Sequence, residues 1–341
     1  MSSDTDKPVK PAHTPYPYHV GQSLTLRDSN GAEFSANIIH EYPFTISPAV
    51  VVNFHKDGVA HEAVLKLYDR RFGETREIWR EPRPHSEASE AAFQDCARNG
   101  LLSPIMDHLK QKELIYDLHG HYPTTEEEEE EEKRKPEHER LAKEEARFYL
   151  EQRKCYNNEV RVYDRLKNLQ GRGIPQFLAT VTFRMPFAPS DLEPSYFHVP
   201  GILIQKIDGF NLTNLVTEMP NGPPEIWTDI IQKAVDLAVE INRAGVLDED
   251  SQPRNALVTR RADNTFQVYR IDFGQAELES DVVFRRDDDP DIFKKWADHY
   301  DDPYGLGGVM ASKVETLTGI KLNIVFEEIF PGVGGIEFDK I

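Results

Sequence analysis

The fold of this chain is constrained most by residues 250–274, which read D-S-Q-P-R-N-A-L-V-T-R-R-A-D-N-T-F-Q-V-Y-R-I-D-F-G. Two apolar runs, Ala256–Val258 and Phe266–Ile271, flank the polar loop Arg260–Thr265, whose Asp-Asn pair suits a turn. This pattern predicts a β-hairpin.

The two ends of a hairpin lie together, so we expect Asp250, Asn255 and Asp272 to occupy one small volume. Two carboxylates and an amide oxygen are hard ligands that suit Mg²⁺, which usually also keeps waters and substrate phosphates in its shell. The alternative is that these residues have a structural role only.

The spacing D-x-x-x-x-N, followed by a hairpin and then D-F-G, resembles the catalytic loop and metal-binding segment of the protein-kinase-like superfamily. This resemblance implies an α+β, bilobal fold with a small antiparallel β N-lobe and a mainly helical, shortened C-lobe. It also implies ATP and Mg²⁺ as cofactors. Asp250 would be the catalytic base that orients a hydroxyl acceptor, on a protein or a small molecule, and Asn255 and Asp272 would hold the metal.

Composition excludes several classes of protein. The net charge of −19 argues against nucleic-acid binding, because a phosphate backbone would be repelled. No run approaches the roughly 20 apolar residues that cross a bilayer, and residues 1–17 lack the apolar core of a secretory signal. The two cysteines form no disulfide framework. We therefore expect a cytoplasmic or nuclear protein without a membrane partner.

We expect a disordered tail at 1–17 and an N-lobe at 18–205. Lys66 lies within an A-V-L-K-L-Y strand, where a half-buried ammonium needs an anionic partner. The resemblance implies that Lys66 is catalytic and binds the ATP phosphates; an edge-strand lysine facing water is the alternative. Four short β-rich segments predict the antiparallel sheet: Ser23–Arg27, Glu33–His40, Val50–Phe54 and Ala63–Tyr68.

An insertion of roughly seventy residues, at about 73–141, is far longer than an ordinary connection. It contains helix-like segments near Glu87–Arg98 and Ser103–Asp117 and the acidic run Glu126–Glu132, which is expected to be solvated or to meet a basic partner. A helix follows from Leu141.

Two glutamates in that helix are candidates to position Lys66. The resemblance favours Glu159, which lies beside an apolar stripe of helical period, over Glu151. A solvated helix carboxylate is the alternative for Glu159.

The C-lobe is expected at 206–341. The strand predicted at Gly201–Ile207 resembles the segment between the lobes, so Gln205 and Ile207 would offer main-chain contacts to adenine. A strong amphipathic helix follows Pro223-Pro224. Only 67 residues follow Gly274, with a helix predicted at Ile292–His299 and no A-P-E sequence. A C-lobe this short resembles that of compact atypical kinases of the fungal, RIO and aminoglycoside-phosphotransferase types.

Two departures from the kinase pattern favour other functions. No G-x-G-x-x-G loop precedes Lys66, which leaves only backbone N–H groups of Ser29–Ala32 to cover phosphates. The acids Asp248, Glu249 and Asp250 are consecutive, so the pKa of at least one should be raised unless a cation neutralises them. The alternatives are a catalytically impaired pseudokinase scaffold and a metal-dependent hydrolase that uses the same acids.

Overall fold

The computed structural model describes most of the chain. The described residues are 14–43, 46–56, 58–73, 76–78, 81–119, 130–131, 133–185, 189–285 and 289–333. The chain divides into two compact units. Unit 1 takes the described residues within 1–61, 65–153 and 181–201, and unit 2 takes those within 62–64, 154–180 and 202–341. The lobe boundary expected after residue 205 stays a prediction.

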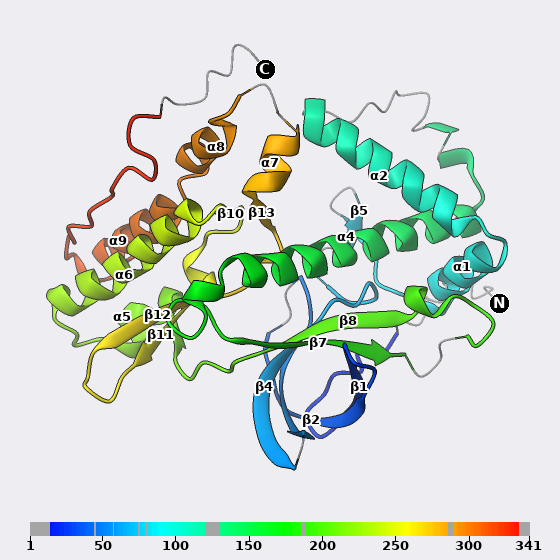
Figure 1. Cartoon of the computed structure of the whole chain (residues 1–341), viewed down its shortest axis with the longest axis horizontal. Helices are drawn as coiled ribbons and strands as arrows, with labels where there is room; N and C mark the ends of the chain where they lie inside the picture. Colours follow the sequence, from blue (N-terminus) through cyan, green and yellow to red (C-terminus); the bar gives the residue numbers. More distant parts are fainter. Residues whose placement is uncertain are drawn as a thin grey trace, which may run out of the picture. The chain divides into compact units, whose positions relative to one another are not determined.

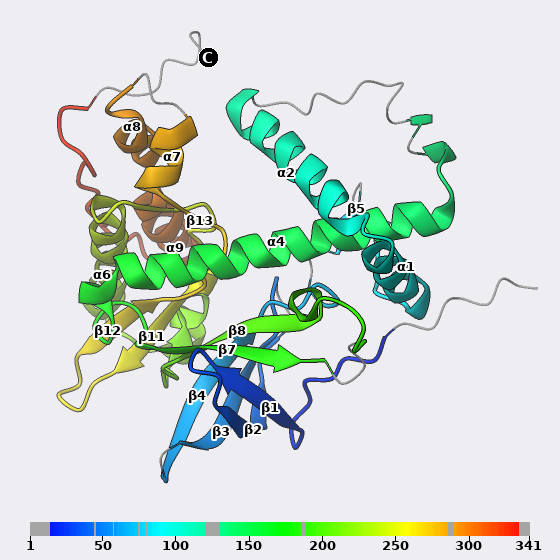
Figure 2. The same cartoon turned by 45° about the vertical axis from the view of Figure 1, so that its right-hand side comes forward.

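Figure 2 shows a closed barrel of six strands. Most residues of this barrel belong to unit 1. Its strands, in barrel order, are β1 (Ser23–Asp28), β2 (Glu33–Glu41), β3 (Ala49–Lys56), β4 (Val59–Leu67), β8 (His198–Ile204) and β7 (Phe177–Arg184). The pairs β1–β2 and β2–β3 are antiparallel, which confirms the small antiparallel sheet predicted from the sequence. The barrel closes because β7 pairs with the end of β1, with Leu26 opposite Phe183. Both of these side chains are buried in its core.

The described part of the insertion is mainly helical. The short strands β5 (Glu77–Ile78) and β6 (Glu81–Pro82) precede α1 (Glu87–Arg98), α2 (Leu102–His119) and α4 (Glu137–Arg165). Both helices predicted in the insertion are confirmed, and α1 begins with a capping box between Ser86 and Ser89. Figures 1 and 2 show α1 and α2 beside the N-terminal half of α4. Of the run Glu126–Glu132, only Glu130 and Glu131 are described, and its basic partner stays a prediction.

A buried cluster of charges joins the insertion to the end of β4. Arg70 pairs with Glu90 of α1 and with Glu145 of α4, each at 2.5 Å, and Arg76 pairs with Glu145 at 2.6 Å. Burial alone would raise the pKa of both carboxyls, but the adjacent guanidinium groups hold each pKa below its usual range. Breaking such a pair from one side leaves an uncompensated buried charge, so the cluster fixes where α1 and α4 dock.

The first described residues belong to the folded unit. Thr14 N–H donates to the carbonyl oxygen of His85 at 3.1 Å, and the ring of Tyr16 packs edge-on against Tyr18 and Phe72. The rest of the tail predicted at 1–17, residues 1–13, lies outside the described residues.

Unit 2 combines two small sheets with helices, which together with the barrel gives the α+β class expected. One sheet has the order β12 (Phe266–Arg270), β11 (Ala256–Arg260), β9 (Phe210–Asn211), and the other pairs β10 (Val246–Asp248) with β13 (Ala276–Leu278). Its helices, besides the end of α4, are α5 (Leu215–Glu218), α6 (Pro224–Arg243), α7 (Glu279–Arg285), α8 (Ile292–Tyr300) and α9 (Asp302–Thr318). None of the described helices has the length and apolar content needed to span a bilayer.

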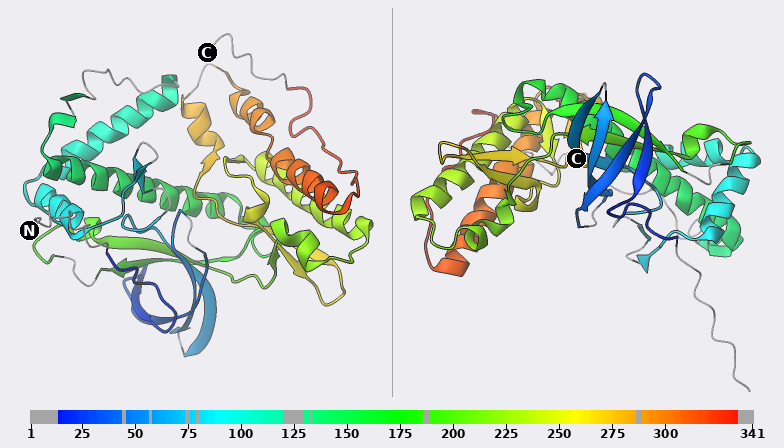
Figure 3. Two further views of the ribbon diagram at one scale, coloured as in Figure 1. Left: turned by 180° about the vertical axis from the view of Figure 1, so that it is seen from behind. Right: turned by 90° about the horizontal axis from the view of Figure 1, so that it is seen from below.

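The core of unit 2 lies between α6 and α9, which run side by side (Figure 3). The apolar face predicted for α6 is buried, from Trp227 through Ile241. The sequence did not predict α9, which carries three glycines within four residues. A Cβ atom on Gly307 would lie 2.4 Å from Val235 Cγ2 of α6, so glycine permits this close packing.

Candidate functional site

The predicted hairpin is confirmed, and the loop from Asp250 to Asn255 lies at one end of it. Strands β11 and β12 pair antiparallel from Ala256 opposite Arg270 to Arg260 opposite Phe266. Beyond the last pair, Ile271 N–H donates to the carbonyl oxygen of Asn255 at 3.0 Å. Asn255 therefore lies next to the segment that carries Asp272.

Asp250 and Asn255 are held together by the amide of Asn255. Its Nδ2 donates to Asp250 Oδ2 at 2.8 Å and to the Asp250 carbonyl oxygen at 3.0 Å. This leaves Asn255 Oδ1 without a hydrogen-bond donor in the part of the chain that the structure describes. A carbonyl oxygen turned away from the acid in this way suits a hard cation. Arg254 pairs with Asp250 Oδ1, so it contacts the expected base directly.

The geometry of Asp272 is set by its neighbours. Its φ is +65°, in the left-handed region that non-glycine residues rarely adopt, at a cost of about 1 kcal/mol. Phe273 is fully buried, and its ring packs edge-on against Tyr163 with centroids 5.9 Å apart. Asn158 Nδ2 donates to the carbonyl oxygen of Gly274 at 3.4 Å. The free energy gained by burying Phe273 thus offsets the cost of the strained backbone at Asp272.

Asp248, in the position where the kinase pattern has His, forms a buried ion pair with Arg270. Arg270 also donates from Nη1 to the carbonyl oxygen of Gln252 at 3.2 Å, so one guanidinium holds both ends of the loop. The pKa of Asp248 is raised, as expected for one of the three acids. The main cause is burial, with a contribution from Asp272, rather than the neighbouring acids of the triplet.

Asp302, at the start of α9, is a site residue that the sequence did not reveal. Its Oδ2 accepts from Asn242 Nδ2 at 2.6 Å and from Asp248 N–H at 3.0 Å. Burial, followed by the charge of Asp248, raises its pKa to about 7. The Asp301-Asp302-Pro303 sequence is a helix-start signal that could have located the residue, but not its contact 54 positions away.

The two candidate glutamates of α4 differ in environment. Glu159 is fully buried, so the solvated alternative is wrong. Glu151 is partly exposed and pairs with Arg147 along the helix at 2.9 Å. One turn beyond Glu159, the buried Tyr163 has a hydroxyl without a hydrogen-bond partner among the described residues. Burial, then the charges of Glu159 and Asp272, raise the pKa of Tyr163.

Lys66 is buried, at 7% exposure, which contradicts the edge-strand alternative. Its Nζ lies 5.5 Å from the centroid of the Tyr68 ring. Lys66 belongs to unit 1, whereas Asp250, Asn255 and Asp272 belong to unit 2. Their joint role therefore stays a prediction.

The two residues expected to contact adenine lie just after β8. Gln205 N–H donates to the carbonyl oxygen of Gln176 at 2.9 Å, and Gln205 Oε1 accepts from Gln176 N–H at 3.1 Å. The Gln205 N–H is thus engaged within the protein, so the predicted adenine contacts would have to come from its carbonyl oxygen and from the backbone of Ile207.

The sequence left backbone N–H groups of Ser29–Ala32, at the tip of the β1–β2 hairpin, as candidates to cover phosphates. In the structure, N–H groups of this tip make other hydrogen bonds. Asp28 Oδ1 accepts from Asn30 N–H at 2.9 Å and from Ala32 N–H at 3.0 Å, while Gly31 N–H donates to the Asp28 carbonyl oxygen. Lys56 pairs with the same carboxylate at 2.9 Å. These amides are therefore satisfied by an acid of the chain.

The described residues contain no group of three or more His, Cys, Asp or Glu side chains suited to a metal ion. The set predicted for Mg²⁺ is smaller, with one carboxylate and one amide oxygen. Such a set needs waters and substrate phosphates to complete the shell, which is the usual arrangement for this ion.

Comparisons with known proteins show no family for this chain. No family model matches it, and neither does any curated protein. Among the solved structures that match is one described as "WaaP in complex with acyl carrier protein", at 17% identity over 48% of this chain and 76% of that chain. The TM-score is 0.29, so this likeness carries no argument for fold or function.

Proposed function

We propose that this protein is an ATP- and Mg²⁺-dependent phosphotransferase of the protein-kinase-like superfamily, acting on a hydroxyl group of a protein or a small molecule. The observation that carries the proposal is the orientation of Asn255. Its amide nitrogen binds the carboxylate of Asp250 while its oxygen is left for a cation, beside the strained turn of Asp272. Phosphoryl transfer requires a base and metal ligands close together. Here the expected base, Asp250, is hydrogen-bonded to one predicted ligand, Asn255, whose backbone carbonyl oxygen accepts from the residue before the other ligand.

Each residue has a role that follows from its surroundings. Asp250 accepts the proton of the acceptor hydroxyl and orients it, while Arg254 and Asn255 fix the rotation of its carboxylate. Asn255 and Asp272 would hold Mg²⁺, and ATP would supply the transferred group. Arg270 keeps the loop rigid through its contacts at both ends.

The remaining predicted residues would bind the nucleotide. A buried ammonium such as that of Lys66 is suited to phosphate oxygens, because burial strengthens its attraction to anions. Glu159, buried on α4, would position it. The backbone at Gln205 and Ile207 would contact adenine.

A second candidate function is a pseudokinase that binds partners and transfers nothing. The observation in its favour is Asp28, which occupies the amides of the hairpin tip and places a carboxylate there. The N–H groups of Asn30 and Ala32 are therefore bonded within the hairpin and are not left to bind phosphate.

Thermal unfolding with and without Mg²⁺ and ATP separates these candidates. A ligand present at about 100 times its dissociation constant stabilises the native state by about 2.7 kcal/mol. We expect millimolar Mg²⁺·ATP to raise the melting temperature, and Asp272→Ala to abolish the increase. The matched control is Asp263→Ala, which removes an exposed acid at the opposite end of the same hairpin and should leave the increase intact.

Transfer itself is tested with radiolabelled ATP, scored for autophosphorylation and for a panel of protein and small-alcohol acceptors. We expect labelled product that Asp250→Asn reduces by about 10²-fold or more while nucleotide binding persists. Binding without transfer to any acceptor would support the pseudokinase, and the absence of binding would contradict both nucleotide-dependent functions.

A further inference from the structure

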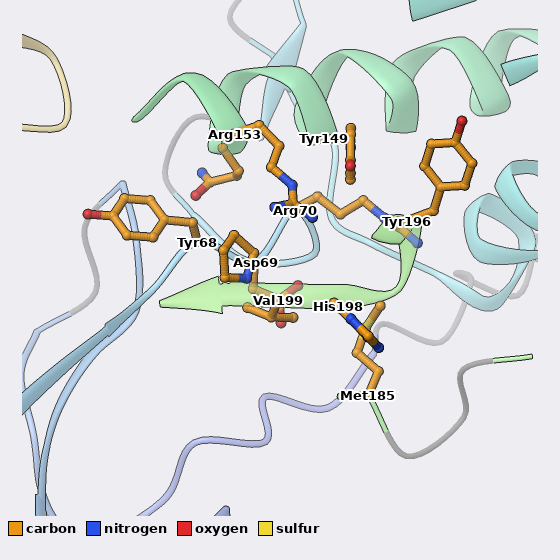
Figure 4. A pocket seen from close by; sticks show the side chains of 11 residues that line it. Tyr68, Asp69, Arg70, Tyr149, Arg153, Met185, Tyr196, His198 and Val199 are labelled. Carbon is orange, nitrogen blue, oxygen red and sulfur yellow. The ribbon is translucent and has the colours of Figure 1, made fainter. Parts of the chain in front are cut away.

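The hollow in unit 1 that Figure 4 shows is filled largely by its own walls. Tyr149 and Tyr196 pack edge-on with centroids 5.8 Å apart, and both rings also contact Phe93. The space that is left has room for about one water molecule. This hollow therefore holds no larger ligand.

The segment that follows α9, residues 320–330, forms a strap on unit 2. Residues 320–328 belong to no helix or strand. Figures 1 and 3 show the strap, in red, turning back from the end of α9 toward α8. The turn begins at Gly319, which ends α9 in the left-handed region with a φ of +73°.

Helix α6 holds the strap by its main chain. Gln232 Oε1 accepts from Val325 N–H, and Gln232 Nε2 donates to the Val325 carbonyl oxygen, each at 2.9 Å. About three turns further along α6, Arg243 donates to the carbonyl oxygens of Ile329 at 2.9 Å and Glu328 at 3.0 Å. Hydrogen bonds to the main chain of an extended segment are a usual way in which proteins bind peptides.

Two buried side chains anchor the ends of the strap. Leu322 and Ile329 are both buried, and Ile329 packs in one apolar cluster with Leu247 of β10 and with residues of α7 and α8. Leu247 directly precedes Asp248, which pairs with Arg270 in the candidate site. The strap therefore completes the core beside the candidate loop.

Between its anchors the strap leaves large apolar side chains in contact with solvent. Val325 is 56% exposed and Phe326 is 41% exposed. The ring of Phe326 lies beside that of Tyr304 on α9, with centroids 5.5 Å apart, and Tyr304 is 58% exposed. Apolar side chains gathered on a surface in this way are typical of a contact with another protein.

A second copy of the chain carries an identical strap, with the same main-chain groups and the same anchors. We propose that two copies exchange their straps, so that residues 320–330 of each copy bind α6 of the other. Exchange keeps the hydrogen bonds of Gln232 and Arg243 and places Ile329 of the partner subunit beside Leu247. It also brings a second copy against the exposed apolar side chains of the strap.

The connection at Gly319 decides between the two arrangements. Within one copy the connection is short, so the strap has a high effective concentration at its own α6, on the order of millimolar. The exchanged dimer is therefore favoured by high protein concentration and by any change that strains the turn. Exchange does not depend on phosphoryl transfer, so it is tested without nucleotide.

The first test is sedimentation of the full chain and of Gly319→Ala, up to about 0.5 mM. No atom lies within 4 Å of a Cβ at this position, so alanine strains only the left-handed backbone. Exchange straightens two such turns in each dimer, so the dimerisation constant should rise about tenfold or more. The matched control is Gly332→Ala, which has a φ of +83° in equally open surroundings beyond the strap and should leave the constant unchanged.

The second test identifies which chain supplies the strap. Light and heavy-isotope chains are unfolded, refolded together and treated with an amine cross-linker, and the dimer is isolated. We expect roughly half of the links between Lys233 of α6 and Lys321 of the strap to join a light chain to a heavy one.

Three results would overturn the exchange of straps. The natural chain and Gly319→Ala could both stay monomeric, which would leave each strap on its own copy. Gly332→Ala could raise the dimerisation constant as much as Gly319→Ala does. A dimer could form in which every link between Lys233 and Lys321 lies within one chain, which would mean that the copies associate through another surface.

Discussion

Replacing Asp302 by asparagine should change how the stability of unit 2 depends on pH. Asp302 is buried, and burial with the charge of Asp248 raises its pKa from 3.8 to about 7. For an acid whose pKa is raised in the folded state, the stabilisation is fully present below the unfolded value and is lost as the pH rises through the folded one. Asp302→Asn keeps the size of the side chain and an oxygen acceptor for Asn242 and Asp248, but it has no charge at any pH.

The expected magnitude follows from the two pKa values. The difference between about 7 and 3.8 is about 3 pH units, and each unit corresponds to about 1.4 kcal/mol. Between pH 4 and pH 7, the natural chain should therefore lose about 4 kcal/mol of unfolding free energy relative to Asp302→Asn. Above pH 7 the variant should be the more stable protein.

Urea unfolding followed by tryptophan fluorescence measures this difference. Of the three tryptophans, Trp227 and Trp296 belong to unit 2, so a Trp79→Phe background reports on that unit. Both proteins are unfolded at intervals between about pH 4.5 and pH 8. Parallel pH profiles for the two proteins, or a variant that is less stable at pH 8, would refute the raised pKa and its cause.

Three further substitutions, the last with a matched control, test the packing of the site by urea unfolding. Arg270→Met leaves the Asp248 carboxylate buried without its cation and should cost about 3–5 kcal/mol; a loss below about 1 kcal/mol would mean that the pair is solvated. Tyr163→Phe removes a buried hydroxyl without a partner among the described residues and should change stability by less than about 1 kcal/mol, whereas a larger loss would reveal a bonded hydroxyl. Gly305→Ala places a Cβ 2.6 Å from the Ser251 carbonyl oxygen and should cost about 1–3 kcal/mol, whereas Gly308→Ala meets only the exposed Tyr304 ring and should be tolerated.

The sequence predicted those elements whose signals are local. The hairpin of β11 and β12 was predicted from its strand-like apolar runs and turn residues, and the helix α6 from the helical period of its apolar residues. All of these signals lie in consecutive residues. The apolar neighbours of Lys66 in β4 predicted a half-buried side chain, with a lysine facing water as the alternative, and the structure shows it buried.

The elements that the sequence did not reveal depend on distant contacts. Helix α9 was missed because three glycines lower its intrinsic helix propensity, although Gly305 and Gly307 are what allow it to pack against Ser251 and α6. The closure of the barrel by β7 joins strands about 150 residues apart, and no local pattern encodes that pairing. The contacts of Arg270 with Asp248 and with the Gln252 carbonyl oxygen were not predicted for the same reason, because the sequence around Arg270 is that of an ordinary strand.

Labelling with an acyl phosphate of ATP, which transfers its acyl group to a lysine beside the bound phosphates, tests the central claim most directly. After proteolysis and mass spectrometry, we expect Lys66 to carry the label. Excess Mg²⁺·ATP should protect it, and Asp272→Ala should reduce the labelling. Modification confined to exposed lysines such as Lys167, with Lys66 unlabelled, would contradict the assignment of this protein as a phosphotransferase.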